Sequence, residues 1–240
     1  NEMIEMHISE IGFCSGHSAS GVWVDERART TVPGLYAAGD MASVPHNYML
    51  GAFTNGMFAG EDAVDYIAAH DFADIDMGQV DAEMKRVLAP TKREDGIPPN
   101  QIEYKTRRLV NDYLQPPKVT RKMLLAQDRF AEVREDLNQM VATDSHELMR
   151  ALEAQSVLDC ADMAAHASMF RTESRWGLYH AYADYPKKNN DDWFCHAQLK
   201  KDDNGKMKSF KRPVAPYIVE IDEEEMGAYD RQRVQADVGD

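Results

Sequence analysis

The chain has 240 residues, 43% of them hydrophobic, and its 27 basic and 41 acidic residues give a formal net charge of -14. This size is enough to bury a core in one or two domains. The acidic excess predicts repulsion from nucleic-acid phosphates, so we expect no nucleic-acid partner. No apolar run approaches the roughly 20 residues that cross a bilayer, so we expect no direct membrane insertion.

The three cysteines, Cys14, Cys160 and Cys195, are odd in number and widely spaced. Because no C-x-x-C pair occurs, they indicate neither a disulfide framework nor a cysteine-held cluster, and we predict no metal site. Reduced thiols of this kind are typical of the cytoplasm, where we expect the protein to reside.

Residues 1–75 are rich in glycine, alanine and other small residues and are predicted to form one domain. The stretch GVWVD at 21–25 alternates in hydrophobicity, as a strand does. After a Pro-Gly turn, GLYAAGD at 34–40 forms a second apolar run that ends in Gly-Asp. Residues 51–70 then read as a helix, because their apolar side chains recur at helical spacing. Those side chains are Phe53, Met57, Val64 and Ile67.

Residues 76–240 are predicted to form a second, mainly helical domain. Helices are expected over 78–88, 101–114, 119–141 and 144–170, with a linker rich in proline and glycine at 89–100. Asp144 and Glu147 form a capping-box-like pair at the start of the last helix. The turn sequence Asp-Asn-Gly at 203–205 predicts a hairpin within 198–213. The fold class is therefore α+β: an α/β segment, then a three-helix-bundle-like domain with a terminal β-hairpin.

The best candidate for a ligand site is the end of the second predicted strand. Small residues there let a flat or phosphorylated ligand approach the backbone, and Asp40 can accept hydrogen bonds from sugar-like hydroxyls. The helix that opens at about Gly51 offers free N–H groups and a positive dipole end to an anionic ligand edge. Together they form half of a cofactor cradle.

Two motifs resemble a known family. GVWVDERARTTVPGLYAAGD at 21–40, with HNYMLGAFTNGMFAGEDA at 46–63, resembles the distal FAD-binding segment of the succinate dehydrogenase and fumarate reductase flavoproteins. FRTESRWGLYHAYADYPKKNNDDWFCH at 170–196 resembles the signature of that family's C-terminal helical domain. The resemblance implies the C-terminal portion of a flavoprotein: the distal part of an FAD-binding α/β domain at 1–75 and a helical domain with a hairpin tail at 76–240.

The resemblance also assigns cofactor-binding residues for FAD. Asp40 matches the acid expected to bind the ribityl hydroxyls, and Gly39 would permit close approach. Phe53, Thr54 and Asn55 match the helix start whose backbone amides face the flavin pyrimidine edge and stabilise negative charge on the reduced ring.

Within the family, SGHSASGVWVD and PHNYMLGAFTNG resemble the alpha subunit of dissimilatory adenylylsulfate reductase. Succinate and fumarate enzymes grip a substrate carboxylate with a loop arginine, whereas this chain has no arginine between Arg29 and Arg86. The resemblance therefore favours a small anionic substrate such as adenylylsulfate over a dicarboxylate. His17 and His46 lie in the two loops that face substrate in relatives and are the candidate catalytic residues.

Arg175, Trp193 and His196 are the most recognisable residues of the second motif. An ion-paired structural arginine and a packed tryptophan are favoured here over a catalytic role. The resemblance implies an iron–sulfur, ferredoxin-like electron-transfer subunit as partner. It also implies an N-terminal FAD-binding half that supplies the remaining cofactor contacts. Because no G-x-G-x-x-G follows a strand, we expect the chain alone to retain FAD poorly.

Two alternatives stay open. The chain could be a non-catalytic helical module that docks a partner subunit and keeps only a vestigial flavin half-site. It could also be an L-aspartate oxidase, which shares the Ser-Arg signature but usually lacks the Trp-x-x-His continuation.

Overall fold

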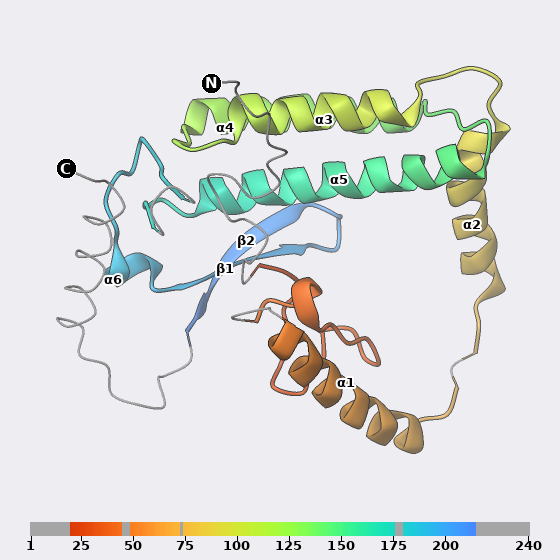
Figure 1. Cartoon of the computed structure of the whole chain (residues 1–240), viewed down its shortest axis with the longest axis horizontal. Coiled ribbons are helices and arrows are strands. Elements are labelled where there is room, and N and C mark those ends of the chain that lie inside the picture. Colours follow the sequence, from red (N-terminus) through yellow and green to blue (C-terminus); the bar gives the residue numbers. More distant parts are fainter. Residues whose placement is uncertain (1–19, 45–48, 73, 176–179, 215–240) are drawn as a thin grey trace, which may run out of the picture. The chain divides into compact units, whose positions relative to one another are not determined.

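The structure is a computed structural model that describes residues 20–44, 49–72, 74–175 and 180–214 (Figure 1). The chain divides into two compact units, Asn1–Met77 and Gly78–Asp240, and each unit is described separately. None of the helices in the described ranges is both long enough and apolar enough to cross a membrane.

The two strands predicted in the first unit are wrong as strands. Residues 21–25 and 34–40 contribute only isolated bridges, a parallel one between Val22 and Ala42 and an antiparallel one between Arg29 and Tyr36. A strand needs a continuous hydrogen-bonded neighbour, and each of these segments is bridged at one residue only, to a partner outside the other segment. The second run then closes into the 3-10 turn η2, Gly39–Met41.

Helix α1, Met49–Ala69, confirms the helix predicted at 51–70. Its apolar side chains are not buried: Phe53 is 72% exposed and Ile67 is 67% exposed. Asp62 is instead the one buried residue among those described on α1. The described chain therefore leaves the apolar face of α1 uncovered.

The second unit is built on three long helices that pack against one another, which confirms the bundle-like prediction (Figure 1). Helix α2, Met77–Leu88, and the short η3, Ala89–Lys92, lead into them. The three bundle helices are α3, Pro99–Tyr113, α4, Thr120–Leu137, and α5, Ser145–Phe170. Proline at the first position of α3 suits its fixed φ and missing N–H.

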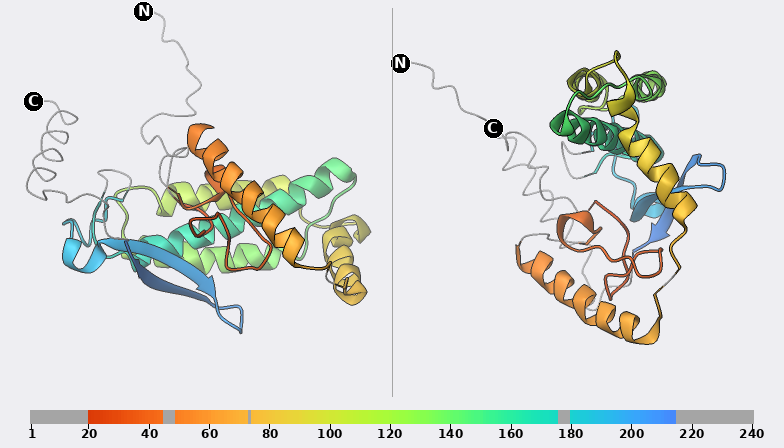
Figure 2. Two further views of the ribbon diagram at one scale, coloured as in Figure 1. Left: turned by 90° about the horizontal axis from the view of Figure 1, so that it is seen from below. Right: turned by 90° about the vertical axis from the view of Figure 1, so that its right-hand side faces the viewer.

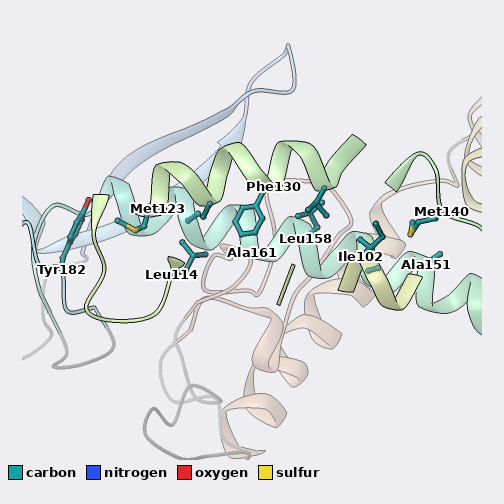
Figure 3. Packing of buried hydrophobic residues seen from close by; sticks show 13 residues of the cluster. Ile102, Leu114, Met123, Phe130, Met140, Ala151, Leu158, Ala161 and Tyr182 are labelled. Atoms are coloured by element: carbon teal, nitrogen blue, oxygen red, sulfur yellow. The ribbon is translucent and has the colours of Figure 1, made fainter. Parts of the chain in front are cut away.

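The core lies where α3, α4 and α5 meet (Figure 3). Phe130 and Met123 of α4 and Leu158 of α5 are fully buried in this core, as their helical spacing predicts. Leu124, which follows Met123 in the sequence, is 51% exposed. The face of α5 is lined by buried alanines, which let three helices approach closely. These alanines are Ala151, Ala154, Ala161 and Ala165.

The predicted cap of α5 is present, in a shifted form. Asp144 accepts a hydrogen bond from the Glu147 amide at 2.8 Å, as an N-cap does. The Glu147 carboxylate accepts from the amide and the hydroxyl of Thr143, both at 2.7 Å, one residue earlier than a standard capping box. These hydrogen bonds hold the pKa of Glu147 below its usual range.

The C-terminal hairpin is also confirmed. After the short helix α6, Asn190–Trp193, strand β1, Cys195–Lys201, pairs antiparallel with β2, Met207–Pro213. Gly205 has φ 75°, a conformation that favours glycine. The Asp202 carboxylate accepts from the amides of Asn204 and Lys206, at 3.0 and 2.9 Å, and so holds the turn.

Candidate functional site

The predicted flavin contacts Gly39 and Asp40 lie in one tight turn. Gly39 is buried with φ 64°, a left-handed conformation that other residues adopt at a cost. A Cβ added to Gly39 would lie 3.4 Å from the Cβ of Ala52, an ordinary contact, so the left-handed φ rather than lack of space favours glycine here. Asp40 follows immediately and is exposed. The turn therefore presents a carboxylate beside the start of α1.

Helix α1 begins at Met49, four residues before Phe53. The amides of Phe53 to Asn55 fall where carbonyls of the preceding turn accept them. The predicted role of Phe53, Thr54 and Asn55 stays a prediction.

The side chains of Thr54 and Asn55 turn back to their own helix. Thr54 Oγ1 donates to the Leu50 carbonyl at 2.9 Å, and Asn55 Nδ2 donates to the Gly51 carbonyl at 2.8 Å. Such bonds fix the two side chains on the first turns of α1. Phe53 is free of this restraint, and its ring is 72% exposed.

The turn and α1 are held together by a buried carboxylate that the sequence reasoning missed. Asp62 is 3% exposed and receives two hydrogen bonds from the Arg29 guanidinium, from Nε at 2.5 Å and from Nη2. The Tyr36 hydroxyl donates to the same carboxylate at 2.8 Å. Hydrogen bonds from Arg29 hold the pKa of Asp62 below its usual range. A bidentate pair fixes direction as well as distance, so residues 29–36 set the orientation of α1.

Apolar side chains of this turn and of the start of α1 are exposed. Met41 is 67% exposed, Met49 74% and Leu50 79%. Scattered exposed apolar residues are ordinary, but contiguous ones around convergent polar groups indicate a binding surface. The predicted catalytic residues His17 and His46 lie outside the described residues and stay predictions.

The second motif forms a buried ion-pair network. Glu173 is fully buried and accepts from Arg175 Nε at 2.5 Å, Arg175 Nη2 at 2.9 Å and Arg171 Nη1 at 2.6 Å. The Asn189 amide adds a fourth hydrogen bond at 2.8 Å. Burial favours the neutral acid, but these hydrogen bonds outweigh it and hold the pKa of Glu173 below its usual range. Arg175 is therefore ion-paired.

Trp193 is packed at the centre of the same region and is 5% exposed. Its Nε1 donates to Thr172 Oγ1 at 3.1 Å, and Phe170 meets it edge to face with ring centroids 5.2 Å apart. The Lys211 ammonium of β2 lies 3.9 Å from the centroid of the Trp193 ring, a cation–π contact. These contacts join the end of α5 to the hairpin, whereas His196 is exposed.

A third cluster joins the segment before α4 to the end of α5. Lys118 Nζ donates to Ser168 Oγ at 2.8 Å and lies 3.4 Å from His180 Nδ1. His180 Nε2 lies 3.0 Å from the Arg171 carbonyl oxygen, which places the proton on Nε2 and a lone pair on Nδ1. Burial lowers the pKa of both Lys118 and His180. The cluster is thus stable with a neutral imidazole.

The match to a known family lies within the second unit of the chain. The family described as fumarate reductase flavoprotein C-term matches residues 104–226, which include most of the bundle, the Glu173 network and the hairpin. The chain belongs to this flavoprotein family.

Relatives of known sequence extend the match beyond the family region. The succinate dehydrogenase flavoprotein subunit of Bacillus subtilis is 26% identical over 195 residues, which cover 74% of this chain and 33% of that protein. The fumarate reductase flavoprotein subunit of Mycobacterium tuberculosis is 26% identical over 217 residues, 81% of this chain and 36% of its own length. The chain thus spans about a third of these relatives.

Solved structures give the same fold. Adenylylsulfate reductase from Archaeoglobus fulgidus aligns with a TM-score of 0.76 and 28% identity over 81% of this chain and 34% of that chain. A mutant of E. coli quinol fumarate reductase FrdA aligns with a TM-score of 0.74 over 85% of this chain and 37% of its own. At 19% identity the second likeness shows the fold alone.

Proposed function

We propose that the chain is the C-terminal part of an FAD-dependent oxidoreductase and that its first unit supplies one wall of the flavin site. The observation that carries this proposal is the juxtaposition of a left-handed glycine turn, an exposed carboxylate and an exposed apolar helix start. Membership of the flavoprotein family supports it.

The residues present fit part of FAD. Exposed Asp40 would accept from the ribityl hydroxyls, and the start of α1 would bind an electron-rich ring edge. Apolar side chains beside them suit a flat ring system. When bound, FAD supplies two-electron chemistry at the flavin ring, while these residues position it and exclude water. The remaining cofactor contacts belong to a part of the flavoprotein outside this chain, so the chain alone would retain FAD poorly.

For the substrate, we favour a small anion of the adenylylsulfate type over a dicarboxylate. Between Arg29 and Arg86 there is no arginine to bind a substrate carboxylate through two hydrogen bonds. The 28% identity with adenylylsulfate reductase also supports this choice. His17 and His46 are the proposed substrate-facing residues. An iron–sulfur subunit is the proposed electron partner, and the cytoplasm the proposed location.

The test is a flavin absorbance spectrum of the complete flavoprotein, followed by titration with adenylylsulfate, sulfite and fumarate. The proposal expects a flavin spectrum that changes with adenylylsulfate or sulfite and stays constant with fumarate. A response to fumarate alone would overturn the substrate choice. A protein that binds no flavin would overturn the enzyme assignment and favour a non-catalytic docking module.

A further inference from the structure

The C-terminal hairpin carries positive charge in an acidic chain. Residues 195–213 contain six basic and two acidic residues, whereas the whole chain has a net charge of -14. The turn end of the hairpin projects from the helices of its own unit in both views of Figure 2. Positive charge is therefore concentrated on one projecting element.

The register separates the two faces of the hairpin. One face includes Ala197 and Lys211, which are cross-strand partners, and the Lys211 ammonium contacts the buried Trp193. This face is turned toward α5, which contacts both strands. Because side chains alternate along a strand, the intervening residues occupy the opposite face. They form the pairs His196 with Arg212, Gln198 with Phe210, and Lys200 with Lys208.

We call this opposite face, defined by those three pairs, the basic face. Its side chains destabilise the isolated hairpin. Lys200 and Lys208 are direct cross-strand partners, and like charges in such positions repel. Phe210 stands between the cations and is 43% exposed. The Lys208 ammonium reaches Asp202 at 3.3 Å, but its side chain stays 67% exposed. The face is thus suited to an anionic polypeptide with apolar residues beside its acids.

The sequence that follows β2 has this chemistry. Residues 220–225 read EIDEEE, five carboxylates in six positions, and residues 217–219 read YIV. They lie outside the described part of the chain, so their role is argued from sequence and from the place where β2 ends. Six residues lie between Pro213 and Glu220, and the seven steps from one to the other span at most about 24 Å. The seven-residue strand is about 23 Å long, so the acidic run can reach every cation of the basic face.

We propose that the acidic segment 220–225 of the same chain docks on the basic face of the hairpin. A short tether gives the segment an effective concentration on the order of millimolar, which favours it over a free acidic partner at ordinary protein concentrations. The apolar residues 217–219 would then lie near Phe210. This inference does not depend on the flavin assignment, since it involves neither the turn at Gly39 nor α1.

A competing explanation assigns the lysines a protective role only. Lysines on an edge strand prevent edge-to-edge pairing, and this role needs no anionic occupant. The two explanations differ in one respect: protection leaves the lysines open to small reagents, whereas docking shields them.

The primary experiment is zero-length carbodiimide cross-linking of the 240-residue chain at low salt, mapped by mass spectrometry. A mixture of unlabelled and nitrogen-15-labelled protein distinguishes bonds within one chain from bonds between two. Lys105 and Asp136, whose charged atoms lie 2.7 Å apart, are the internal positive control. We expect Lys200 or Lys208 to join the 220–225 peptide within one chain, with loss of these bonds at high salt.

The second readout is the acetylation rate of Lys200 and Lys208. Even an affinity of about 1 mM keeps the segment docked for about half of the time at a millimolar effective concentration. Neutralising the tail acids should therefore raise the rate about twofold. The tail variant is Glu220→Gln, Asp222→Asn, Glu223→Gln, Glu224→Gln and Glu225→Gln. A control with the same change in charge uses exposed acids elsewhere: Glu26→Gln, Glu61→Gln, Asp71→Asn, Asp74→Asn and Asp81→Asn.

Each outcome decides the proposal. Cross-links within one chain, together with faster acetylation in the tail variant and an unchanged rate in the control, support it. Cross-links only between chains would assign the face to a second copy and overturn it. Formation of the Lys105–Asp136 bond without any tail bond would also overturn it and leave the protective role.

Discussion

Removing the Glu173 carboxylate is the sharpest test of how the helical unit is held together. The change Glu173→Ala deletes an acceptor of four hydrogen bonds and leaves Arg171 and Arg175 facing each other. Their side chains are 7% and 10% exposed. Breaking a buried pair in this way costs about 3–5 kcal/mol. Because water reaches the edge of both arginines, we expect about 3 kcal/mol.

The assay is urea unfolding followed by far-UV circular dichroism. With a slope of about 2 kcal/mol per molar urea, a loss of about 3 kcal/mol lowers the midpoint by about 1.5 M. The control is Glu153→Ala, whose exposed carboxylate meets Arg150 at 3.3 Å and contributes less than about 1 kcal/mol. If both variants shifted the midpoint equally, the network would not stabilise this unit as described.

Three further predictions follow. Because the pKa of His180 is lowered in the folded state, the unfolded state binds a proton first as the pH falls. The unfolding free energy therefore decreases below about pH 6.5. His180→Asn should reduce this pH dependence, measured as urea midpoints between pH 5 and 7. Phe130→Ala should lower the unfolding free energy by about 3–5 kcal/mol, against less than about 1 kcal/mol for exposed Leu124→Ala. Asp62→Asn should speed hydrogen exchange in α1, whereas Asp65→Asn should not. Equal exchange rates in both variants would refute the role of Asp62 in holding α1.

Periodicity was enough to predict the helical unit. The spacing of Met123, Phe130 and Leu158 reports a face that the same chain covers, and local turn chemistry fixes the hairpin and the cap at Asp144. Ala151, Ala154 and Ala161 of α5 were not predicted to be buried, because small side chains add little to a hydrophobic pattern. Periodicity and turn patterns therefore predict an element correctly where the segments that it packs against lie within the described chain.

The first unit shows the opposite case. Residues 21–25 and 34–40 have strand-like patterns, but patterns do not report whether a neighbouring strand is present. The ion pair between Arg29 and Asp62 links residues far apart in sequence, and Asp62 looks no different from exposed Asp65 in the sequence. Long-range partners of this kind cannot be read from local chemistry.

The Glu173 network could be predicted from the sequence only in part. Arg171, Glu173 and Arg175 are spaced two residues apart, and in an extended segment such residues share one face. Opposite charges alternating at this spacing are a signal from which a bridging carboxylate could have been predicted. Its complete burial depends on Trp193 and Asn189, which approach from a later segment.

The most direct test of the central claim is the FAD content of the complete flavoprotein with Asp40→Ala. Losing hydrogen bonds to a charged group costs about 1.5–3 kcal/mol, which weakens FAD binding by about 10- to 150-fold. Asp65→Ala, an exposed acid on α1, is the matched control. The account predicts that the Asp40 variant is purified depleted of flavin while the control retains it. Equal flavin content in both variants would contradict the assignment of Asp40.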